Sequence, residues 1–275
     1  MTYATVMVHL ELGQSNAHLL NVAGDVAQQF HADVIGIAAC QPMQLTFTDG
    51  YLPPELIDED REEIEREFAK AEREFHDALR KRVVGLEWRS RVTFGSLADY
   101  IAREARSADL VITGLDKASL LGTSSSVSAS ELIMCIGRPV LIVPSGPDAL
   151  KLERVIIGWK DTREARRATF DALPLLKKAA HVSVVEIADE EECGAARARL
   201  DDVVGWLARH GVTAQALAFH PAGDDATRLA AIAQEQAADV IVAGAYGHSR
   251  VREWILGGVT RDLLLATPRC ALMSH

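Results

Sequence analysis

The sequence predicts an α/β protein made of two tandem, doubly wound domains, each with a five-stranded parallel sheet. Short apolar runs alternate with amphipathic segments, which is typical of strands and crossover helices in a parallel sheet covered on both faces. The pattern also occurs twice. EARSADLVITGL (104–115) matches EQAADVIVAGAY (235–246), and each contains a glycine at the end of an apolar run, Gly114 or Gly244. Such internal similarity indicates a repeated structural unit.

Each half reads as strand and helix in alternation up to a fifth strand. The matching segments, in chain order, are ATVMVHLE (4–11) with ERVIIGWK (153–160), ADVIGIAA (32–39) with AHVSVVEI (180–187), TFGSLADYIAREA (93–105) with FHPAGDDATRLAAIAQEQ (219–236), and GRPVLIVP (137–144) with PRCALMSH (268–275). Between the copies, PSGPDALK (144–151) has the proline and glycine content of a linker. We therefore predict domains at 1–144 and 151–275.

The halves differ after the second strand. In the first half, Asp49-Gly50 and Pro53-Pro54 predict a loop. A long helix with an apolar stripe follows, formed by Ile57, Ile64, Phe68, Phe75 and Leu79. We interpret its acidic run, Asp58 to Glu67, as a solvated face, with a partner surface as the alternative. The matching segment of the second half (189–211) predicts a shorter helix that ends at Gly211.

The composition argues against several classes of protein. The net charge is −10, which disfavours binding to nucleic acid or an anionic membrane surface. No apolar run approaches the length of about 20 residues that a membrane helix needs, and the first residues do not resemble a signal peptide. The cysteines, Cys40, Cys135, Cys193 and Cys270, are far apart and form no metal-ligand pattern. We expect reduced thiols in a cytoplasmic protein.

A glycine-rich segment, GAYGHSRVREWILGGVT (244–260), follows the predicted fourth strand of the second half. Ligands of open parallel sheets bind at the carboxyl ends of strands, and glycines allow a close approach of the backbone. Gly257 and Gly258 precede a predicted helix, whose free N–H groups suit a phosphate, and Thr260 adds a hydroxyl. The alternative is that the glycines only mark turns and helix caps. GxxxxGK[ST] is absent, as is GxGxxG after either first strand, which disfavours a P-loop enzyme or a standard dinucleotide-binding domain.

The spacing Gly-x2-Gly-x9-Gly followed by a small residue resembles the ATP-binding motif of the universal stress protein family. ERVIIGWKDTREARRATFDALPLL (153–176) resembles the first strand and helix of that family, and the duplication resembles its tandem members. The resemblance implies an adenine-nucleotide α-hydrolase-like, Rossmann-like fold. It also implies ATP, ADP or AMP in the second domain, with or without Mg²⁺.

The resemblance also implies which residues form the pocket. Those expected to border adenine and ribose are Gly158, Trp159, Lys160, Asp161 and Ile187, with Ala243, Gly244 and Gly247 lining the same side; those expected to hold phosphates are Gly257, Gly258, Val259 and Thr260. Two positions depart from the family pattern. Lys160 stands where the family has an acidic residue, and Gly258 stands where a serine or threonine is usual.

The first copy of the motif is degenerate. Lys117 replaces the second glycine, Ser126-Val127 replaces Gly257-Gly258, and the first strand ends in Glu11. We expect this domain to bind ATP weakly or not at all and to act as a structural partner. The resemblance further implies an intramolecular pseudo-dimer in which GRPVLIVP and PRCALMSH are the pairing strands, and it allows a homodimer of chains.

No catalytic set is evident. The sequence lacks GxSxG and HExxH, and His220 and His248 are interpreted as polar loop residues. We favour a nucleotide-binding protein with a regulatory or stress-response role and no catalytic residues. One alternative is a slow ATPase or nucleotidyl-transfer enzyme on the same scaffold. Another is a non-nucleotide interaction protein that uses the charged helix at 55–83 and the paired domains as partner surfaces.

Overall fold

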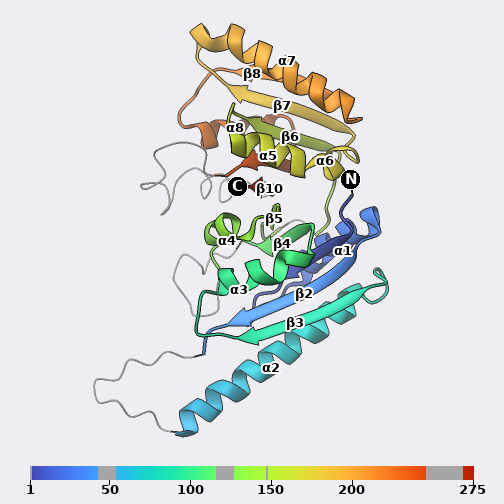
Figure 1. Ribbon diagram of the computed structural model, residues 1–275, viewed down its shortest axis with the longest axis vertical. Coiled ribbons are helices and arrows are strands. Elements are labelled where there is room, and N and C mark those ends of the chain that lie inside the picture. The colour runs from blue at the N-terminus through green and yellow to red at the C-terminus, as the bar shows by residue number, and fades with distance from the viewer. Residues whose placement is uncertain (1, 43–53, 116–126, 147, 246–268) are drawn as a thin grey trace, which may run out of the picture.

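The computed structural model describes residues 2–42, 54–115, 127–146, 148–245 and 269–275, and the structural statements below concern these residues. Their strands form one ten-stranded sheet in the order β3-β2-β1-β4-β5-β10-β9-β6-β7-β8 (Figure 1). Strands are parallel within β1–β5 and within β6–β10. We call these two blocks, each with its helices, the N-terminal half and the C-terminal half.

The N-terminal half runs from the first to the fifth strand. Its elements are β1 (Thr5–His9), α1 (Ala17–Phe30), β2 (Asp33–Cys40), α2 (Pro54–Leu79), β3 (Leu86–Val92), α3 (Leu97–Glu104) with a 3-10 turn (Ala105–Ser107), β4 (Leu110–Gly114), α4 (Ala129–Ile136) and β5 (Val140–Val143). The sheet order places the first strand in the centre, between the second and the fourth. This is the doubly wound arrangement that the sequence predicts.

The C-terminal half repeats that order. Its described elements are β6 (Arg154–Trp159), α5 (Arg163–Asp171), α6 (Leu173–Leu176), β7 (His181–Ile187), a 3-10 turn (Glu190–Glu192), α7 (Cys193–Arg209), β8 (Ala214–Phe219), α8 (Asp225–Glu235), β9 (Val240–Gly244) and β10 (Cys270–Ser274). Here β6 is central, between β7 and β9. The predicted α/β fold class is therefore confirmed.

The two halves meet edge to edge through their last strands. β5 and β10 pair antiparallel, with Leu141 opposite Leu272. Two further contacts join the halves: the Tyr3 hydroxyl donates to the Asp171 carbonyl oxygen at 2.7 Å, and the Leu150 N–H donates to Asp25 Oδ2 at 2.8 Å. GRPVLIVP and PRCALMSH thus contribute the strands that join the sheet across the halves.

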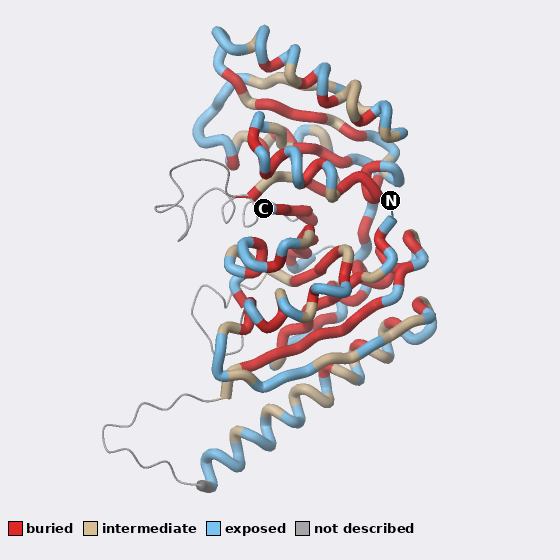
Figure 2. Tube along the Cα trace, viewed as in Figure 1, coloured by how far each residue is buried: buried red, intermediate tan, exposed pale blue. Residues whose placement is uncertain are grey.

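The core consists of two apolar layers, one on each face of the sheet. Alternate residues of a strand point to opposite faces, so Val6 and Val8 join one layer and Met7 joins the other. Helices α1, α2, α5, α6 and α7 contribute to the first layer, and α3, α4 and α8 to the second. Figure 2 shows the central strands buried and the outer faces of the helices exposed. Burial on both faces explains why the strand sequences are continuous apolar runs.

An aspartate before the fourth strand anchors the start of the first strand in both halves. Asp109 Oδ2 accepts hydrogen bonds from the N–H groups of Ala4 and Thr5, at 2.8 and 3.0 Å. Asp239 Oδ2 accepts from Glu153 and Arg154, at 3.0 and 2.9 Å. The Ala-Asp pair that recurs in the sequence therefore has the same structural role twice.

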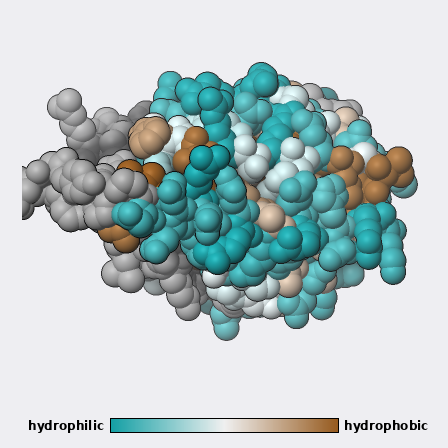
Figure 3. Space-filling view, turned by 90° about the horizontal axis from the view of Figure 1, so that it is seen from below, coloured by the Kyte–Doolittle hydropathy of each residue, from teal (hydrophilic) through white to brown (hydrophobic). Residues whose placement is uncertain are grey.

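Helix α2 departs from its prediction at one end. The apolar stripe is buried at Phe75 and Leu79, but Ile57 is 53% exposed. The helix has 26 residues, which is about 39 Å, whereas the seven residues of β3 span about 23 Å, so the first turns extend beyond the strands that they were expected to cover (Figure 1). The end of the molecule that carries α2 is mostly hydrophilic (Figure 3), in keeping with the solvated acidic face predicted for this helix.

Candidate functional site

The carboxyl ends of β6 and β9 bring several predicted site residues together. Gly158 pairs directly with Ala243, and Gly244 is the last residue of β9. Lys160 and Asp161 follow β6, and Ile187 ends β7, the neighbouring strand on the other side. The chain leaves β6 toward β7 on one side, while β9 lies on the other, so this edge is a topological switch point. The fold therefore places these residues where open α/β sheets bind ligands.

The remaining predicted site residues lie outside the described residues. They are Gly247, Gly257, Gly258, Val259 and Thr260, and the N-terminal counterparts Lys117 and Ser126 lie outside as well. Their assignment to a nucleotide stays a prediction from the sequence.

The two described glycines of the site have packing roles inside the protein. A Cβ on Gly244 would lie 2.5 Å from the backbone N of Ala165, in the first turn of α5. A Cβ on Gly158 would lie 2.7 Å from Leu229 Cδ2, the flexible end of a side chain. On this side of Gly244 the close neighbour is helix α5, so the glycine is required by the fold whatever else it contacts.

The first turn of α5 is capped by the protein's own groups. Thr162 Oγ1 accepts a hydrogen bond from the Ala165 N–H at 3.3 Å, and Glu164 is buried and paired with Arg163. Burial acts to raise the pKa of the Glu164 carboxyl. The hydrogen bond from Arg163 and further hydrogen bonds outweigh burial, so this pKa lies below its ordinary value. An ionised carboxylate therefore already occupies this helix start.

Three exposed cations surround the β6–α5 loop. Lys160 Nζ lies 3.3 Å from Asp225 Oδ2 at the start of α8, and Arg166 pairs with Asp161 at 2.7 Å. The third cation is Arg163. The side chain of Lys160 is 72% exposed and that of Arg163 is 81% exposed. Exposed ion pairs contribute little to stability, about 0–1 kcal/mol, so Lys160 and Arg166 can exchange their partners for an anionic ligand at low cost, whereas Arg163 pairs with the buried Glu164.

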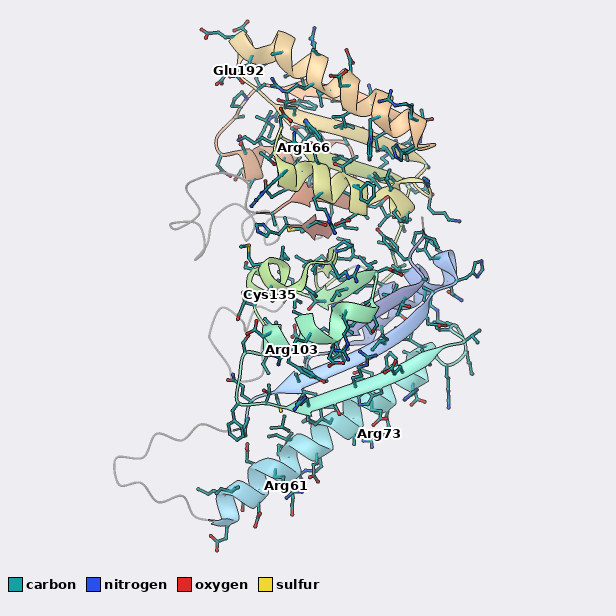
Figure 4. The ribbon with its side chains drawn as sticks, viewed as in Figure 1. Arg61, Arg73, Arg103, Cys135, Arg166 and Glu192 are labelled. Carbon is teal, nitrogen blue, oxygen red and sulfur yellow. The ribbon has the colours of Figure 1, made fainter. Side chains whose placement is uncertain are left out.

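A partly buried ion pair at the neighbouring strand β7 was missed by the sequence analysis. Arg199 of α7 donates to Glu186 of β7, with Nη2 2.5 Å from Oε1. The hydrogen bond to Glu186 raises the pKa of Arg199, and the charge of Asp161 adds to this effect. Figure 4 labels Arg166 on α5 and Glu192, which lies directly before α7. The pair thus links α7 to β7.

A row of polar groups crosses the sheet at this level. Ser274 pairs with Gly244, Trp159 lies beside Gly244, and Glu186 pairs with Trp159. Within the described part of the chain, Ser274 Oγ, Trp159 Nε1 and Glu186 Oε2 are buried and have no hydrogen-bond partner. The aligned residues of the N-terminal half are Val143, Leu10 and Ala38, all apolar and buried. A residue-by-residue alignment of the two repeats in the sequence would have revealed these polar-to-apolar differences.

The equivalent edge of the N-terminal half is closed by carboxylates. Glu74 of α2 accepts from the Asn16 N–H at 2.8 Å and from Ser15 Oγ at 3.2 Å. Glu67 accepts from the Gly13 N–H at 2.8 Å. The cavity at this edge has a volume of about 170 Å³ and is lined by Glu11 among others, whereas small-molecule sites usually have about 300–1,000 Å³. The cavity at this edge is therefore smaller than most small-molecule sites, and its surroundings are acidic.

His9, at the end of β1, lies within the same half. It is buried, and its Nδ1 is 3.1 Å from Thr113 Oγ1 on β4. Burial lowers the pKa of His9 to about 4. The imidazole is therefore neutral at physiological pH and belongs to the core.

The described residues contain no group of three or more histidine, cysteine or acidic residues suited to a metal ion. None of their helices is both long and apolar enough to cross a membrane. All four cysteines are free thiols, with Cys40 and Cys270 buried.

Solved structures with the same architecture include universal stress proteins. One from Archaeoglobus fulgidus DSM 4304 matches with a TM-score of 0.76 and 17% identity, over 98% of this chain and 95% of that chain. A protein from Pseudomonas aeruginosa UCBPP-PA14, provisionally assigned to the family, matches with a TM-score of 0.64 and 15% identity, over 99% and 93% of the two chains. A protein of unknown function from Pseudomonas aeruginosa PAO1 gives 0.62 and 14%, over 99% and 92%.

Comparison of the sequence with known families and proteins, unlike comparison of the structure, gives no match. No protein-family model matches the chain. No curated protein matches it either. At these low identities the structural likeness establishes the fold, and the described part of the chain has the universal stress protein fold in both halves.

Proposed function

We propose that this chain is a tandem universal stress protein that binds one adenine nucleotide in its C-terminal half and acts as a regulatory or stress-response protein. The observation that carries the proposal is the convergence of Gly158, Lys160, Ala243 and Gly244 at the switch point of the C-terminal half. The glycine-rich segment 244–260 starts at that point in the sequence. The spacing of the glycines in this segment supports a phosphate site next to a site for the base and the ribose.

The residues present fit an anionic nucleotide in this half better than in the other. Lys160 and Arg166 lie at the carboxyl end of β6 in exposed pairs with Asp225 and Asp161, which an anionic ligand can replace. Ala243 leaves little side-chain bulk near the end of β9. Gly257, Gly258, Val259 and Thr260 are the proposed phosphate contacts, and Mg²⁺, when present, would neutralise part of the phosphate charge.

The two halves form the intramolecular pseudo-dimer of this proposal, with domains at 1–144 and 151–275. The antiparallel β5–β10 pair supports it, because these are the edge strands left by each five-stranded block. In this arrangement the N-terminal half supplies the edge strand β5, which pairs with β10, and does not bind a second nucleotide. The proposal includes no catalytic residue.

The first test is to identify and titrate the ligand. Freshly purified full-length protein is denatured, released nucleotide is identified by mass spectrometry, and stripped protein is titrated with ATP, ADP and AMP, with and without Mg²⁺. We expect one adenine nucleotide per chain. Absence of bound nucleotide together with no binding at millimolar concentrations would overturn the proposal.

A matched pair of variants tests where the nucleotide binds and whether ATP is hydrolysed there. Gly247→Glu adds bulk and negative charge to the proposed site and should abolish binding. Lys117→Glu introduces the same residue at the equivalent position of the N-terminal half and should leave binding unchanged. A time course of ADP formation from ATP should stay at the level of the Gly247→Glu variant, whereas turnover above that level would favour the ATPase alternative.

A further inference from the structure

The two outer strands of the sheet differ in charge. The described sheet ends at β3 on one side and at β8 on the other (Figure 1). β3 carries three charged side chains, Glu87, Arg89 and Arg91. β8 has the sequence AQALAF, which contains neither a charged residue nor a proline. Charged side chains and proline are common means by which an edge strand avoids pairing with another chain. β8 lacks this protection.

The backbone of β8 directs hydrogen-bonding groups away from the sheet. The Phe219 carbonyl oxygen accepts from the Ala188 N–H at 2.9 Å, on the side of β7. Backbone groups of successive residues in a strand point to opposite sides in the plane of the sheet, so those of Ala214, Ala216 and Ala218 point away from β7. None of the six residues of β8 is buried, although five of them are apolar. This strand therefore presents donors, acceptors and apolar surface to a further strand.

The sequence of β8 fits antiparallel pairing with a second copy of itself. A two-fold axis at Ala216 places this residue opposite its own counterpart and places Ala214 opposite Ala218 of the partner subunit. These three alanines share one face of the sheet, where they pack against the core layer. On the other face, Gln215 would lie opposite Leu217 of the partner subunit. This register brings no like charges together within the paired strands.

The chain already contains one pairing of this kind. β5 and β10 are the outer strands of the two five-stranded blocks, and they pair antiparallel within the chain. Helices cover both faces of the sheet in each half without preventing this contact. An antiparallel pair of β8 strands would extend the sheet in the same way at its outer end.

Helix α7 adds complementary charges beside the outer side of β8. Arg199 marks the flank of α7 that lies toward β7, because it bonds Glu186. At 3.6 residues per turn, Arg197 and Asp201 lie on the opposite flank. Both side chains are exposed, and within the part of the chain that the structure describes neither has an ion-pair partner. The residues that bury α7 between these flanks are Ala196, Leu200, Val203 and Leu207.

Pairing of two β8 strands would bring two α7 helices to packing distance. α7 contacts both β7 and β8, so its axis lies near the boundary between these strands. Neighbouring strands are about 4.8 Å apart, which puts the two helix axes about 10 Å apart across the paired strands. Packed helices are usually about 8–10 Å apart. Because the two helices run antiparallel, Arg197 can meet Asp201 of the partner subunit on both sides of the axis.

We infer that a second copy of this chain docks on β8, forming a two-fold dimer with one continuous sheet across both chains. The β8 strands pair antiparallel about Ala216, and Arg197 pairs with Asp201 of the partner subunit. An interface built on one short strand and one helix per chain is small, so the dimer forms in a concentration-dependent manner. The inference does not depend on nucleotide binding.

The first test measures the mass of the full-length protein by sedimentation equilibrium from micromolar to millimolar concentration. We expect an equilibrium between monomer and dimer. Gln215→Lys adds a charge to an exposed position of β8 and should weaken the dimer about tenfold. The matched control is Ser90→Lys, which adds the same charge to an exposed position of β3, at the other edge of the sheet. Ser90→Lys should leave the dimer unchanged.

Exchange of charges tests the helix contact. Arg197→Asp and Asp201→Arg each place like charges together twice in the dimer, and each should weaken it about tenfold. The double variant Arg197→Asp, Asp201→Arg restores opposite charges across the axis and should recover most of the wild-type affinity. The circular dichroism of all these variants should match that of the wild type, because the changed side chains are exposed.

Three results would overturn the inference. The first is a monomer at every concentration, which would leave β8 without a second copy as its partner. The second is a dimer that Ser90→Lys weakens and Gln215→Lys does not, which would place the contact at β3. The third is a double variant that dimerises as weakly as the single variants, which would show that Arg197 and Asp201 do not meet across the axis.

Discussion

The N-terminal and C-terminal halves share one fold and differ in what they place at the carboxyl ends of their first strands. In the N-terminal half, Glu67 and Glu74 reach from α2 to the β1–α1 loop and use its hydrogen-bond donors. In the C-terminal half, α7 presents Arg199 to Glu186 near the β6–α5 loop, and Lys160 and Arg166 lie at that loop. The described carboxylates thus bond backbone and hydroxyl groups at the N-terminal edge, whereas at the C-terminal edge they pair with cations. Fold alone does not specify a ligand site, because charge at a few positions decides it.

The row of buried polar groups in the C-terminal half is a second difference between the two halves. Trp159, Glu186 and Ser274 place buried polar atoms where the N-terminal half has Leu10, Ala38 and Val143. Buried polar groups cost free energy unless they are satisfied. Among the described residues the N-terminal half also has such atoms, His9 Nε2 and Gln29 Oε1, but at these three aligned positions it is apolar.

The largest expected effect tests the glycines at the ends of the two fourth strands. Gly244→Ala would place a Cβ 2.5 Å from backbone atoms of α5, which cannot move as a side chain does, and should cost about 3 kcal/mol in the free energy of unfolding. Gly114→Ala would place its Cβ 3.4 Å from Glu11 Oε1 and should cost less than about 1 kcal/mol. Urea denaturation of both variants measures the difference, and equal losses would contradict the different packing of the halves.

The second expected effect is a pH dependence that belongs to the N-terminal half. The pKa of His9 is about 4 in the folded protein and about 6.5 when unfolded, so between these values the unfolded chain binds more protons. Stability is then fully present above pH 6.5 and falls as the pH drops toward 4, by about 2 kcal/mol between pH 7 and pH 5. Urea denaturation at both pH values should show this loss in wild type and a smaller loss in His9→Gln. Identical losses would show that His9 is not buried as a neutral imidazole.

The smallest expected effect concerns the carboxylates that close the N-terminal edge. Glu74→Gln weakens the acceptor for the Asn16 N–H and the Ser15 hydroxyl and should cost about 1 kcal/mol. Hydrogen exchange should become faster in the segment 13–16. Glu72→Gln is the control, because Glu72 lies one half-turn earlier and only approaches His76 at 3.9 Å. The same exchange rates in both variants would show that Glu74 does not hold this loop.

Much of the fold was predictable because the sequence repeats its own pattern. The apolar runs give the strands, and the last strands of the two halves pair with each other. The domain bounds at 1–144 and 151–275 stay a prediction. The exposure of Ile57 was not predictable, since the apolar stripe says nothing about the length of the sheet below the helix. Glu67 was assigned to a solvated face, yet it bonds Gly13, 54 residues earlier in the chain.

The candidate site was predictable in part. Spacing and resemblance selected Gly158, Lys160, Asp161, Ile187, Ala243 and Gly244, and the fold brings the ends of their strands together. The close approach of α5 to Gly244 and the Arg199–Glu186 pair depend on tertiary contacts between distant segments. A one-dimensional pattern contains no information about such contacts. The phosphate contacts proposed for Gly247, Gly257, Gly258, Val259 and Thr260 remain a sequence prediction.

The central claim is that one nucleotide binds, and that it binds in the C-terminal half. The most direct test is photolabelling of the intact chain with 8-azido-ATP, followed by mass measurement of the intact protein and peptide mapping. The account predicts a single label per chain, competed by ATP and located on peptides within 151–275. Two labels per chain, or a competed label on peptides within 1–144, would contradict it.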